Sequence, residues 1–342
     1  MRSATTVSRK RLLEIGAGAG AFASIAILRG PANAAQFSYK LANDQTPTHP
    51  MNVATAEAVK RIADATGGQL DIKLFPSSLL GGDTQMLAQV RSGAIDLVQM
   101  GNNILGSVIP SAALLSMPFA FTSPQQYQAA ANGPLGAYIG GAGAKIGLRK
   151  FETSFYGGFF EVQNHLRPIT VPADLRGLKI RVPPGPIDVG TFKAFDASPT
   201  VITLSEVYVS LQTHLIDGIE VPLPTVRNFK FYEQLKYCSL THHSGLSYLL
   251  FANTDAWQRL PKSMQDIVDR EFNAAAATAT KSMAGQEVSV EAELTADGMV
   301  FNRPALEPFS QVIRASGLYR QWRDQYDPKG WEMLEKTTGK LM

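Results

Sequence analysis

Short strands that alternate with helices constrain the fold of this 342-residue chain more than any other feature. Phe37–Leu41 and Leu70–Leu74 place apolar side chains at every second position, which predicts strands. Between them, apolar residues follow a helical spacing up to Gly67, which is well suited to end a helix. A second helix over Asp83–Gly93, with Asp83 as its cap, leads to a third strand at Ile95–Met100. This order predicts a parallel sheet covered by helices.

A second unit of the same kind follows in the middle of the chain. It begins near Tyr156 and contains a strand at Lys179–Val182, followed by a helix that Ser205 caps and that ends at Asp217. The apolar strand Ser247–Ala252 is then expected to return to the first sheet. Two α/β lobes of this kind fit the roughly 300 residues that follow Ala34.

A long helix is predicted near the carboxyl end. From Ser263 to about Thr295 there is no proline, and Gly285 is the one helix-breaking residue. At about 1.5 Å per residue, one helix over this stretch would reach roughly 50 Å, more than a small domain needs. Two helices that meet at Gly285 are the alternative.

The strand at Lys179–Val182 carries the most informative polar side chain. Ile180 alternates with Lys179 and Arg181, and a proline-rich turn over residues 183–186 ends the strand. An arginine at such a strand end can direct its planar guanidinium across a cleft and bind both oxygens of a carboxylate. A surface or ion-paired arginine is the alternative.

Five segments of the chain resemble the solute-binding proteins of TRAP (tripartite ATP-independent periplasmic) transporters, of the DctP type. They read DLRGLKIRVP, SEVYVSLQTHLIDGIEVP, FPSSLLGGDTQMLAQVRSGAIDLVQ, LLSMPFAFTS and FANTDAWQRLP. The resemblance covers nearly the whole chain after residue 35. It implies a two-lobed periplasmic-binding-protein fold, in which each lobe is a mostly parallel sheet with flanking helices and the long helix spans both lobes.

The lobes are expected to be built from separate pieces of the chain. Residues 35–157 with about 247–285 are predicted to form lobe I, and residues 158–246 with about 286–342 to form lobe II. The remaining residues, 1–34, are interpreted as an export signal peptide.

Residues 1–34 have the features of an export signal. The segment Ser8–Leu13 resembles a twin-arginine export motif, with Lys10 at the position where the second arginine is usual. The apolar run Ile15–Leu28 is shorter than the roughly 18 residues that are needed to span a bilayer. Cleavage is expected after Ala34, and general secretory export is the alternative to the twin-arginine route. We therefore expect a periplasmic protein, with no membrane anchor because no cysteine follows the cleavage site.

The charge of the chain argues against nucleic acid as a partner. Residues 1–34 contain five basic residues and one acidic residue, so the rest of the chain has 27 basic and 28 acidic residues. Its formal net charge is then −1, whereas the whole chain has +3. No electrostatic attraction to nucleic acid or to an anionic membrane is expected.

No catalytic, cofactor or metal motif stands out in the sequence. There is no G-x-S-x-G, H-E-x-x-H, phosphate loop or dinucleotide fingerprint after Ala34. The adjacent His242 and His243 cannot point the same way in a strand, so they are not expected to share a metal. The single cysteine, Cys238, allows no internal disulfide and is interpreted as a buried filler. We expect a binding protein, with no enzyme activity and no cofactor.

The resemblance assigns residues of lobe II to a ligand site. Arg181 matches the family arginine that binds the ligand carboxylate. Glu220 matches a position near the pocket, where it can accept protons from ligand hydroxyl or amine groups or, alternatively, support Arg181 in an ion pair. Two positions depart from the family pattern: Val221 stands where many members carry asparagine, and Phe160-Glu161 stands where another arginine is frequent.

These departures make the expected pocket less polar. One cation and one amide donor are missing, while Leu204 and Phe160 add apolar wall. We therefore expect the ligand to be a monocarboxylate with an apolar or aromatic body, in preference to a dicarboxylate or a highly hydroxylated sugar acid.

Lobe I is expected to contribute side chains from its strand ends. Asn43 and Asp44 follow the first strand, and Asn102 and Asn103 follow the third. Ligand sites lie beyond the carboxyl ends of parallel strands, although local turn formation is the alternative for these residues. His242 falls near a cleft histidine of the family, with a core or hinge histidine as the alternative.

Together these features predict the solute-binding subunit of a TRAP transporter. It would capture a small organic acid between its lobes, close, and deliver the acid to a membrane permease. A sensor that presents its closed form to a receptor is one alternative, and a periplasmic enzyme on the same scaffold is another.

Overall fold

The computed structural model describes residues 35–342, apart from the side chain of Glu287, so the predicted export signal of residues 1–34 lies outside the described residues. Within residues 35–342, ten strands form one continuous sheet in the order β2-β1-β3-β9-β5-β8-β6-β7, with β4 and β10 also paired to β9. The strands are β1 Phe37–Ala42, β2 Leu70–Phe75, β3 Leu97–Gly101, β4 Leu148–Lys150, β5 Phe155–Asn164, β6 Lys179–Val182, β7 Ser198–Val201, β8 Gly218–Val221, β9 Tyr237–Asn253 and β10 Val300–Asn302.

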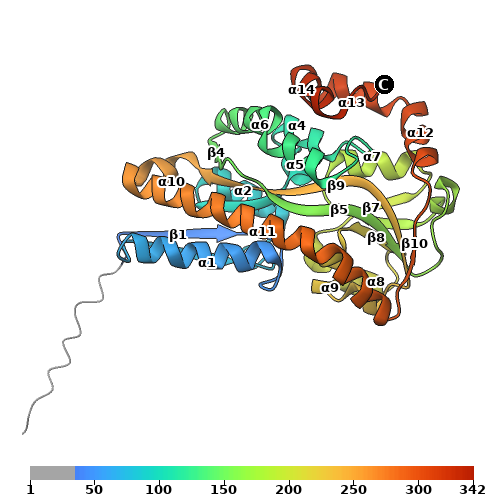
Figure 1. Ribbon diagram of the computed structural model, residues 1–342, viewed down its shortest axis with the longest axis horizontal. Helices are drawn as coiled ribbons and strands as arrows, with labels where there is room; N and C mark the ends of the chain where they lie inside the picture. The colour runs from blue at the N-terminus through green and yellow to red at the C-terminus, as the bar shows by residue number, and fades with distance from the viewer. Residues whose placement is uncertain (1–34) are drawn as a thin grey trace, which may run out of the picture. The chain divides into compact units, whose positions relative to one another are not determined.

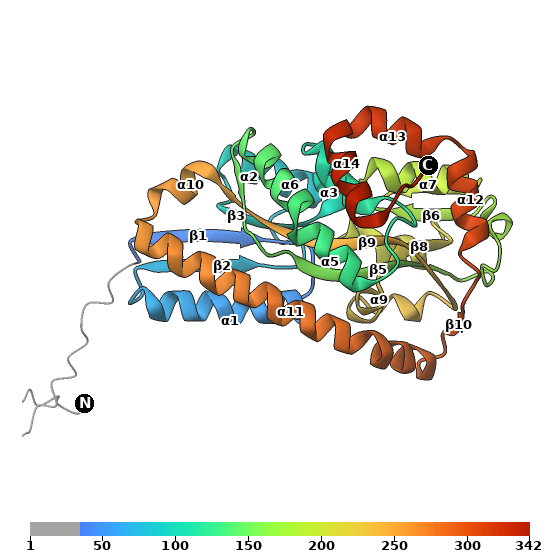
Figure 2. The same cartoon turned by 45° about the horizontal axis from the view of Figure 1, so that its top comes forward.

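Helices lie on both faces of this sheet (Figures 1 and 2). The α-helices are α1 Pro50–Ala65, α2 Asp83–Ser92, α3 Asn102–Leu105, α4 Pro110–Ala113, α5 Pro124–Asn132, α6 Pro134–Ala144, α7 Pro186–Ala194, α8 Val207–Gln212, α9 Leu223–Asn228, α10 Thr254–Arg259, α11 Lys262–Ala296, α12 Glu307–Ala315, α13 Leu318–Tyr326 and α14 Pro328–Thr338. Short 3-10 helices are η1 Leu114–Ser116, η2 Pro172–Leu175, η3 Leu204–Glu206 and η4 Phe231–Glu233.

The sheet consists of two parallel groups joined by long antiparallel strands. In lobe I, β1 runs parallel to β2 and β3, and in lobe II, β6 runs parallel to β7 and β8. β9 pairs antiparallel with β3 and β5, and β5 pairs antiparallel with β8, so β5 and β9 link the groups. The predicted two-lobed α/β fold is confirmed. The lobe boundaries at residues 157/158, 246/247 and 285/286 remain a prediction because the sheet is continuous there.

Three apolar clusters fill the layers between the sheet and the helices. One lies under α1 and α11 and contains Met51 and Phe272. A second lies under α2–α7 and α12–α14 and contains Tyr127 and Trp331. The third, with Phe231, lies under α8, α9 and the end of α11. Both faces of the sheet are therefore covered, as expected for parallel strands rich in apolar residues.

The long helix predicted from the sequence is confirmed as one element. α11 continues through Gly285, so the alternative of two helices is wrong. α11 packs against α1 and β5 and, further along, against α9 (Figure 1), so it contacts both lobes. Across residues 35–342, no helix combines the length and the apolar character needed to cross a bilayer.

The helix predicted to start at Ser205 is shorter than expected. Ser205 lies in η3, and α8 covers Val207–Gln212. The backbone of His214 adopts a left-handed conformation with a φ of 54°, which cannot continue a helix. Asp217 instead joins the sheet, because its backbone N–H donates to the Lys179 carbonyl oxygen and its carboxylate accepts the Lys179 N–H, each at 2.8 Å.

The strand predicted at Ser247–Ala252 is longer than expected. β9 starts ten residues earlier, at Tyr237, and its register with β5 shifts between the pairs Val162–Ser239 and Phe160–Ser244. The residues in between form a bulge in which His242 has a φ of 41°. This bulge interrupts the two-residue alternation, which explains why the sequence pattern revealed only the end of the strand.

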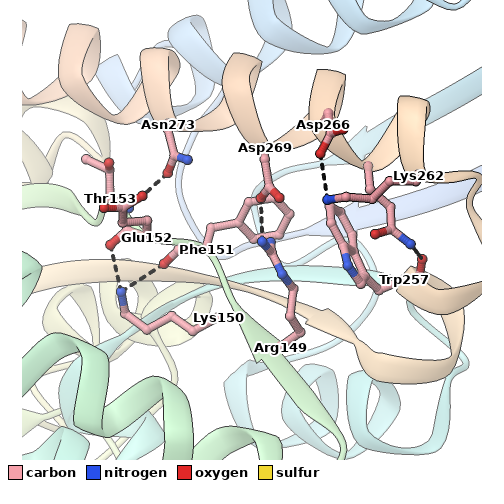
Figure 3. A network of polar contacts seen from close by, with 11 residues as sticks. Arg149, Lys150, Phe151, Glu152, Thr153, Trp257, Lys262, Asp266, Asp269 and Asn273 are labelled. Atoms are coloured by element: carbon pink, nitrogen blue, oxygen red, sulfur yellow. Dashed lines mark hydrogen bonds and ion pairs between the residues drawn. The ribbon is translucent and has the colours of Figure 1, made fainter.

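Polar contacts attach α11 to the segment between β4 and β5 (Figure 3). Arg149 forms an ion pair with Asp269 at 2.5 Å, and the Asn273 side chain accepts the backbone N–H of Thr153 at 2.9 Å. The Arg149 guanidinium also lies 4.4 Å from the centroid of the Phe151 ring and 4.0 Å from that of Trp257. A single cation thus joins α11, β4 and α10.

Replacing Arg149 with methionine is expected to destabilise the protein. Arg149→Met keeps most of the alkyl stem but removes a half-buried ion pair and two cation–π contacts, which together contribute about 1–2 kcal/mol. Urea unfolding followed by circular dichroism measures the change. Lys262→Met is the matched control, because the Lys262–Asp266 pair lies at 2.7 Å on the exposed surface of the same helix and should contribute less than about 0.5 kcal/mol. An equal loss in the two variants would contradict this account.

Candidate ligand-binding site

A cavity of about 30 Å³ lies between the two lobes, beyond the carboxyl ends of β1, β3 and β6. Its lining residues are Asp44, Gln45, Asp83, Gly101, Asn103, Ile104, Phe160, Arg181, Pro183, Leu204, Val221, Thr225, Leu246 and Tyr248. The lobes touch beside it: a Cβ atom on Gly82 would lie 3.1 Å from the Thr203 hydroxyl, and one on Gly185 would lie 3.3 Å from the Cβ of Asn103. This is the position in which α/β sheets place their ligand sites.

Arg181 is the one cationic side chain in this lining. β6 positions it in the third of its four residues, and its side chain is 3% exposed. Nε donates to the Ile202 carbonyl oxygen at 2.8 Å, which fixes the plane of the guanidinium. Among residues 35–342, no carboxylate lies within ion-pairing distance of it. A guanidinium without a carboxylate partner can bind one through two parallel hydrogen bonds.

Four buried carboxyl groups surround Arg181 at longer range. The pKa of Arg181 is lowered by burial, and Asp83, Glu220, Asp44 and Asp188, in decreasing order of effect, oppose this shift. Burial raises the pKa of Asp44 to about 8, with a further contribution from the Asp83 carboxylate. Burial also raises the pKa of Asp83, and it raises those of Asp188 and Glu220 well above the usual range. The region around the cavity thus contains more acidic groups than the single arginine can neutralise.

Glu220 lies behind the cavity wall and is fully buried. Its Oε2 lies 2.7 Å from Nε2 of His243, and Nδ1 of His243 lies 2.8 Å from the Thr241 hydroxyl. Burial lowers the pKa of His243 to about 4, so this imidazole is neutral at pH 7. Glu220 therefore contacts β9 directly and forms no ion pair with Arg181, while its neighbour Val221 lines the cavity.

Glu161 and His242 form a separate pair at the bulge in β9. The Glu161 carboxylate accepts the backbone N–H of His242 at 2.9 Å and lies 2.5 Å from its Nδ1. Both residues line a second cavity of about 200 Å³, together with Phe159. Successive residues of a strand point to opposite sides, so Phe160 reaches the cavity of Arg181 and Glu161 does not.

The structure brings together six of the eleven predicted site residues. Those that line the cavity are Arg181, Val221, Phe160, Leu204, Asp44 and Asn103, and those that do not are Glu220, Glu161, Asn43, Asn102 and His242.

The side chains of Asn43 and Asn102 form hydrogen bonds inside lobe I and do not line the cavity. The Asn43 amide donates to Asn52 at 2.7 Å and to Gln99 at 3.0 Å. The Asn102 amide donates to the Ser116 hydroxyl at 2.7 Å, and its oxygen accepts the backbone N–H of Ser247 at 2.8 Å. These side chains are buried with their hydrogen-bonding capacity used inside lobe I.

The sequence interpretation missed several lining residues, above all Asp83 and Gln45. Asp83 was interpreted as a helix cap, but it is the first residue of α2 and is 3% exposed. One signal that could have revealed it is the pair Gly81-Gly82 before it, because Gly82 leaves room for Thr203 of the other lobe. Gln45 directly follows Asp44 at the end of β1, where polar side chains were already expected. Thr225 and Tyr248 carry no comparable signal.

No group of three histidine, cysteine or acidic residues within residues 35–342 is arranged to hold a metal ion.

Comparisons with known proteins agree with this architecture. Residues 41–323 match the family described as "DctP: Bacterial extracellular solute-binding protein, family 7". The 2,3-diketo-L-gulonate-binding periplasmic protein YiaO of Escherichia coli is 33% identical over 232 residues, which cover 67% of this chain and 69% of that protein. The sialic acid-binding periplasmic protein SiaP of Vibrio cholerae is 29% identical over 270 residues, or 78% of this chain and 83% of that protein.

Solved structures show the same fold. A TRAP periplasmic solute-binding protein from Xanthobacter autotrophicus, with bound β-D-galacturonate, has a TM-score of 0.82 at 26% identity and covers 88% of this chain and 99% of that one. A second, from Sulfitobacter, has a TM-score of 0.84 at 22% identity and covers 89% of this chain and 100% of that one. The resemblance to solute-binding proteins of TRAP transporters is confirmed, and this chain belongs to family 7 of the bacterial extracellular solute-binding proteins, the DctP family.

Proposed function

We propose that this protein captures a small organic acid, a monocarboxylate, in the cavity between its lobes and delivers it to a membrane permease. The observation that carries the proposal is Arg181, a buried guanidinium at a strand end that lines the cavity and donates its Nε–H to the Ile202 carbonyl oxygen. Support comes from two related proteins whose names give acids as ligands, 2,3-diketo-L-gulonate and sialic acid.

Arg181 is proposed as the carboxylate-binding residue, with Phe160, Leu204 and Val221 as apolar walls. Asp44 and Asn103 are proposed as the contacts from lobe I. Glu220 is proposed to support Arg181 through its charge, and Glu161 and His242 to support the bulge of β9. Asn43 and Asn102 are proposed to hold the strand ends of lobe I in place.

Binding is proposed to require opening of the cleft. A cavity of about 30 Å³ holds about one water molecule, so a six-carbon acid enters only when the lobes separate. A ligand that contacts both lobes then favours the closed form by its differential contacts. This gives the permease a surface that differs between the loaded and the empty protein.

The location and the partner follow from the same proposal. Residues 1–34 would direct export through the twin-arginine route, with cleavage after Ala34, and the mature protein would act in the periplasm without a membrane anchor. It would bind the permease of a TRAP transporter and catalyse no reaction. Incubating candidate acids with the protein and measuring turnover tests the last point.

A thermal-shift screen tests the proposal for the ligand. The compounds are aromatic and branched monocarboxylates, D-glucuronate, D-galacturonate, N-acetylneuraminate and succinate. We expect the largest rise in Tm from a monocarboxylate with an apolar or aromatic body, because the apolar side chains of Phe160, Leu204 and Val221 line the cavity. A strong rise with succinate or N-acetylneuraminate and none with the apolar monocarboxylates would contradict this ligand class.

Replacing Arg181 with lysine is expected to weaken binding of the best monocarboxylate by roughly 10-fold to 100-fold. Lysine keeps the charge but cannot bind both carboxylate oxygens in one plane, and the loss of one hydrogen bond to a charged group costs about 1.5–3 kcal/mol. Isothermal titration calorimetry measures the affinity. Arg176→Lys is the control, since Arg176 is 73% exposed and pairs with Asp196 on the surface. Unchanged affinity in Arg181→Lys would refute the assignment.

The contribution of Asp44 to the free energy of unfolding is expected to fall as the pH rises. Its pKa is about 8 in the folded protein and about 3.8 without the fold, so between these values only the folded protein keeps the proton. The ionisation of Asp44 therefore lowers the free energy of unfolding progressively from about pH 4 to about pH 8. Asp44→Asn should remove this loss and gain at least about 1 kcal/mol between pH 5 and pH 8, since one pKa unit corresponds to about 1.4 kcal/mol.

Urea unfolding at pH 5, 6, 7 and 8 measures this effect. The matched control is Asp64→Asn on the exposed side of α1, which should show the same pH dependence as the unmodified protein. A gain from Asp44→Asn that is constant with pH, or that falls as the pH rises, would contradict the assignment.

A further inference from the structure

The cavity lining also contains polar side chains from lobe I, which form a second polar wall beside Arg181. It is made of Asp44, Asp83 and Gln45, all from lobe I and all at least nine-tenths buried. Oδ2 of Asp83 and Oε1 of Gln45 have no hydrogen-bond partner within residues 35–342. Asp44 accepts one hydrogen bond, from the Gln45 amide at 3.2 Å. This wall therefore presents oxygen acceptors to the cavity.

The cavity lining contains fewer cationic than acidic side chains. Arg181 is the one cation among the lining residues, against the two carboxyl groups of Asp44 and Asp83. A ligand carboxylate would occupy the guanidinium of Arg181 and bring another negative charge into the same buried space. His49, whose ring lies 5.8 Å from that of Tyr248, adds no positive charge at pH 7 because burial lowers its pKa to about 3. With a simple monocarboxylate, Asp44 would keep its proton at pH 7, because no second cation would be present to stabilise its ionised form.

We propose that the ligand is a zwitterion, an acid whose carboxylate binds Arg181 and whose ammonium group binds Asp44, Asp83 and the side-chain oxygen of Gln45. This inference rests on the proposed function and specifies its ligand. An ammonium group has three N–H donors and no acceptor, which matches a wall of three acceptors. Its charge also offsets the buried carboxylates, whereas a hydroxyl group does not. Tyr248 lines the same wall, and an aromatic ring adds attraction for a cation.

The raised pKa values of Asp44 and Asp83 in the free protein agree with the absence of a cation beside these two carboxyl groups. Burial raises the pKa of Asp83, and it raises the pKa of Asp44 to about 8. A cation between them would lower both values.

The test compares acids that differ in one group. Each set contains an amino acid, the hydroxy acid of equal length and the unsubstituted acid: 4-aminobutanoate, 4-hydroxybutanoate and butanoate; the six-carbon equivalents; and 4-(aminomethyl)benzoate, 4-(hydroxymethyl)benzoate and 4-methylbenzoate. Isothermal titration calorimetry at pH 7 gives the affinities. In at least one set the amino acid should bind at least tenfold more tightly than both of its partners.

Asp83→Asn and Asp44→Asn show whether the acidic pair causes the preference. Each variant keeps the size of the side chain and removes a negative charge, so the ratio between amino acid and hydroxy acid should fall to within threefold. Asp64→Asn on α1 should keep the full ratio. The same titrations with EDTA should give the same result, and an affinity that EDTA abolishes would mean that a metal ion satisfies the pair, which overturns the inference.

The experiments distinguish a wrong ligand class from a wrong function. If a hydroxy acid, an unsubstituted acid or a sugar acid binds through Arg181 and no amino acid binds more tightly, the zwitterion is wrong and the proposed function stands. If no carboxylate binds, or if Arg181→Lys leaves the affinity unchanged, the proposed function itself is wrong.

Discussion

The buried guanidinium of Arg181 is the group on which the arrangement of the cleft depends. A cation that is 3% exposed costs several kcal/mol unless nearby anions offset the loss of water. The carboxyl groups that oppose the lowering of the Arg181 pKa come from separate parts of the chain: Asp44 follows β1, Asp83 begins α2 and Asp188 lies in the first turn of α7. Lobe I and lobe II therefore share one charge cluster. The position of each lobe affects the electrostatic energy of the other.

The strands that link the lobes carry a second constraint. β9 bends at a bulge where the backbone of His242 is left-handed, and two buried carboxylates hold this bulge in place. Glu161 binds the backbone N–H of His242, and Glu220 binds the ring of His243. In the sequence, Glu161 directly follows Phe160 and Glu220 directly precedes Val221. Phe160 and Val221 line the cavity, whereas the two carboxyl groups contact β9 instead.

Much of the fold was predictable because its signals are local. The alternation in β1, β2 and β6, and the absence of helix-breaking residues in α11, reflect the period of each element directly. The site was predictable only in part. The sequence places Asp44 and Asn43 side by side at a strand end, but only packing decides that Asn43 turns inward to Asn52 while Asp44 faces the cavity. An aspartate at the start of a helix is common, so the sequence pattern gave no reason to expect Asp83 in the cavity as well.

Closure of the lobes sets a requirement on any ligand of this site. Arg181, Val221 and Leu204 all belong to lobe II, so an acid that contacted these residues alone would bind equally well in the open and the closed form. Such a ligand shifts no equilibrium, however tightly it binds. Contact with Asp44 or Asp83 of lobe I is what makes affinity depend on closure. In the proposed site, the polar group at the far end of the ligand, more than its carboxylate, would therefore determine whether binding closes the lobes.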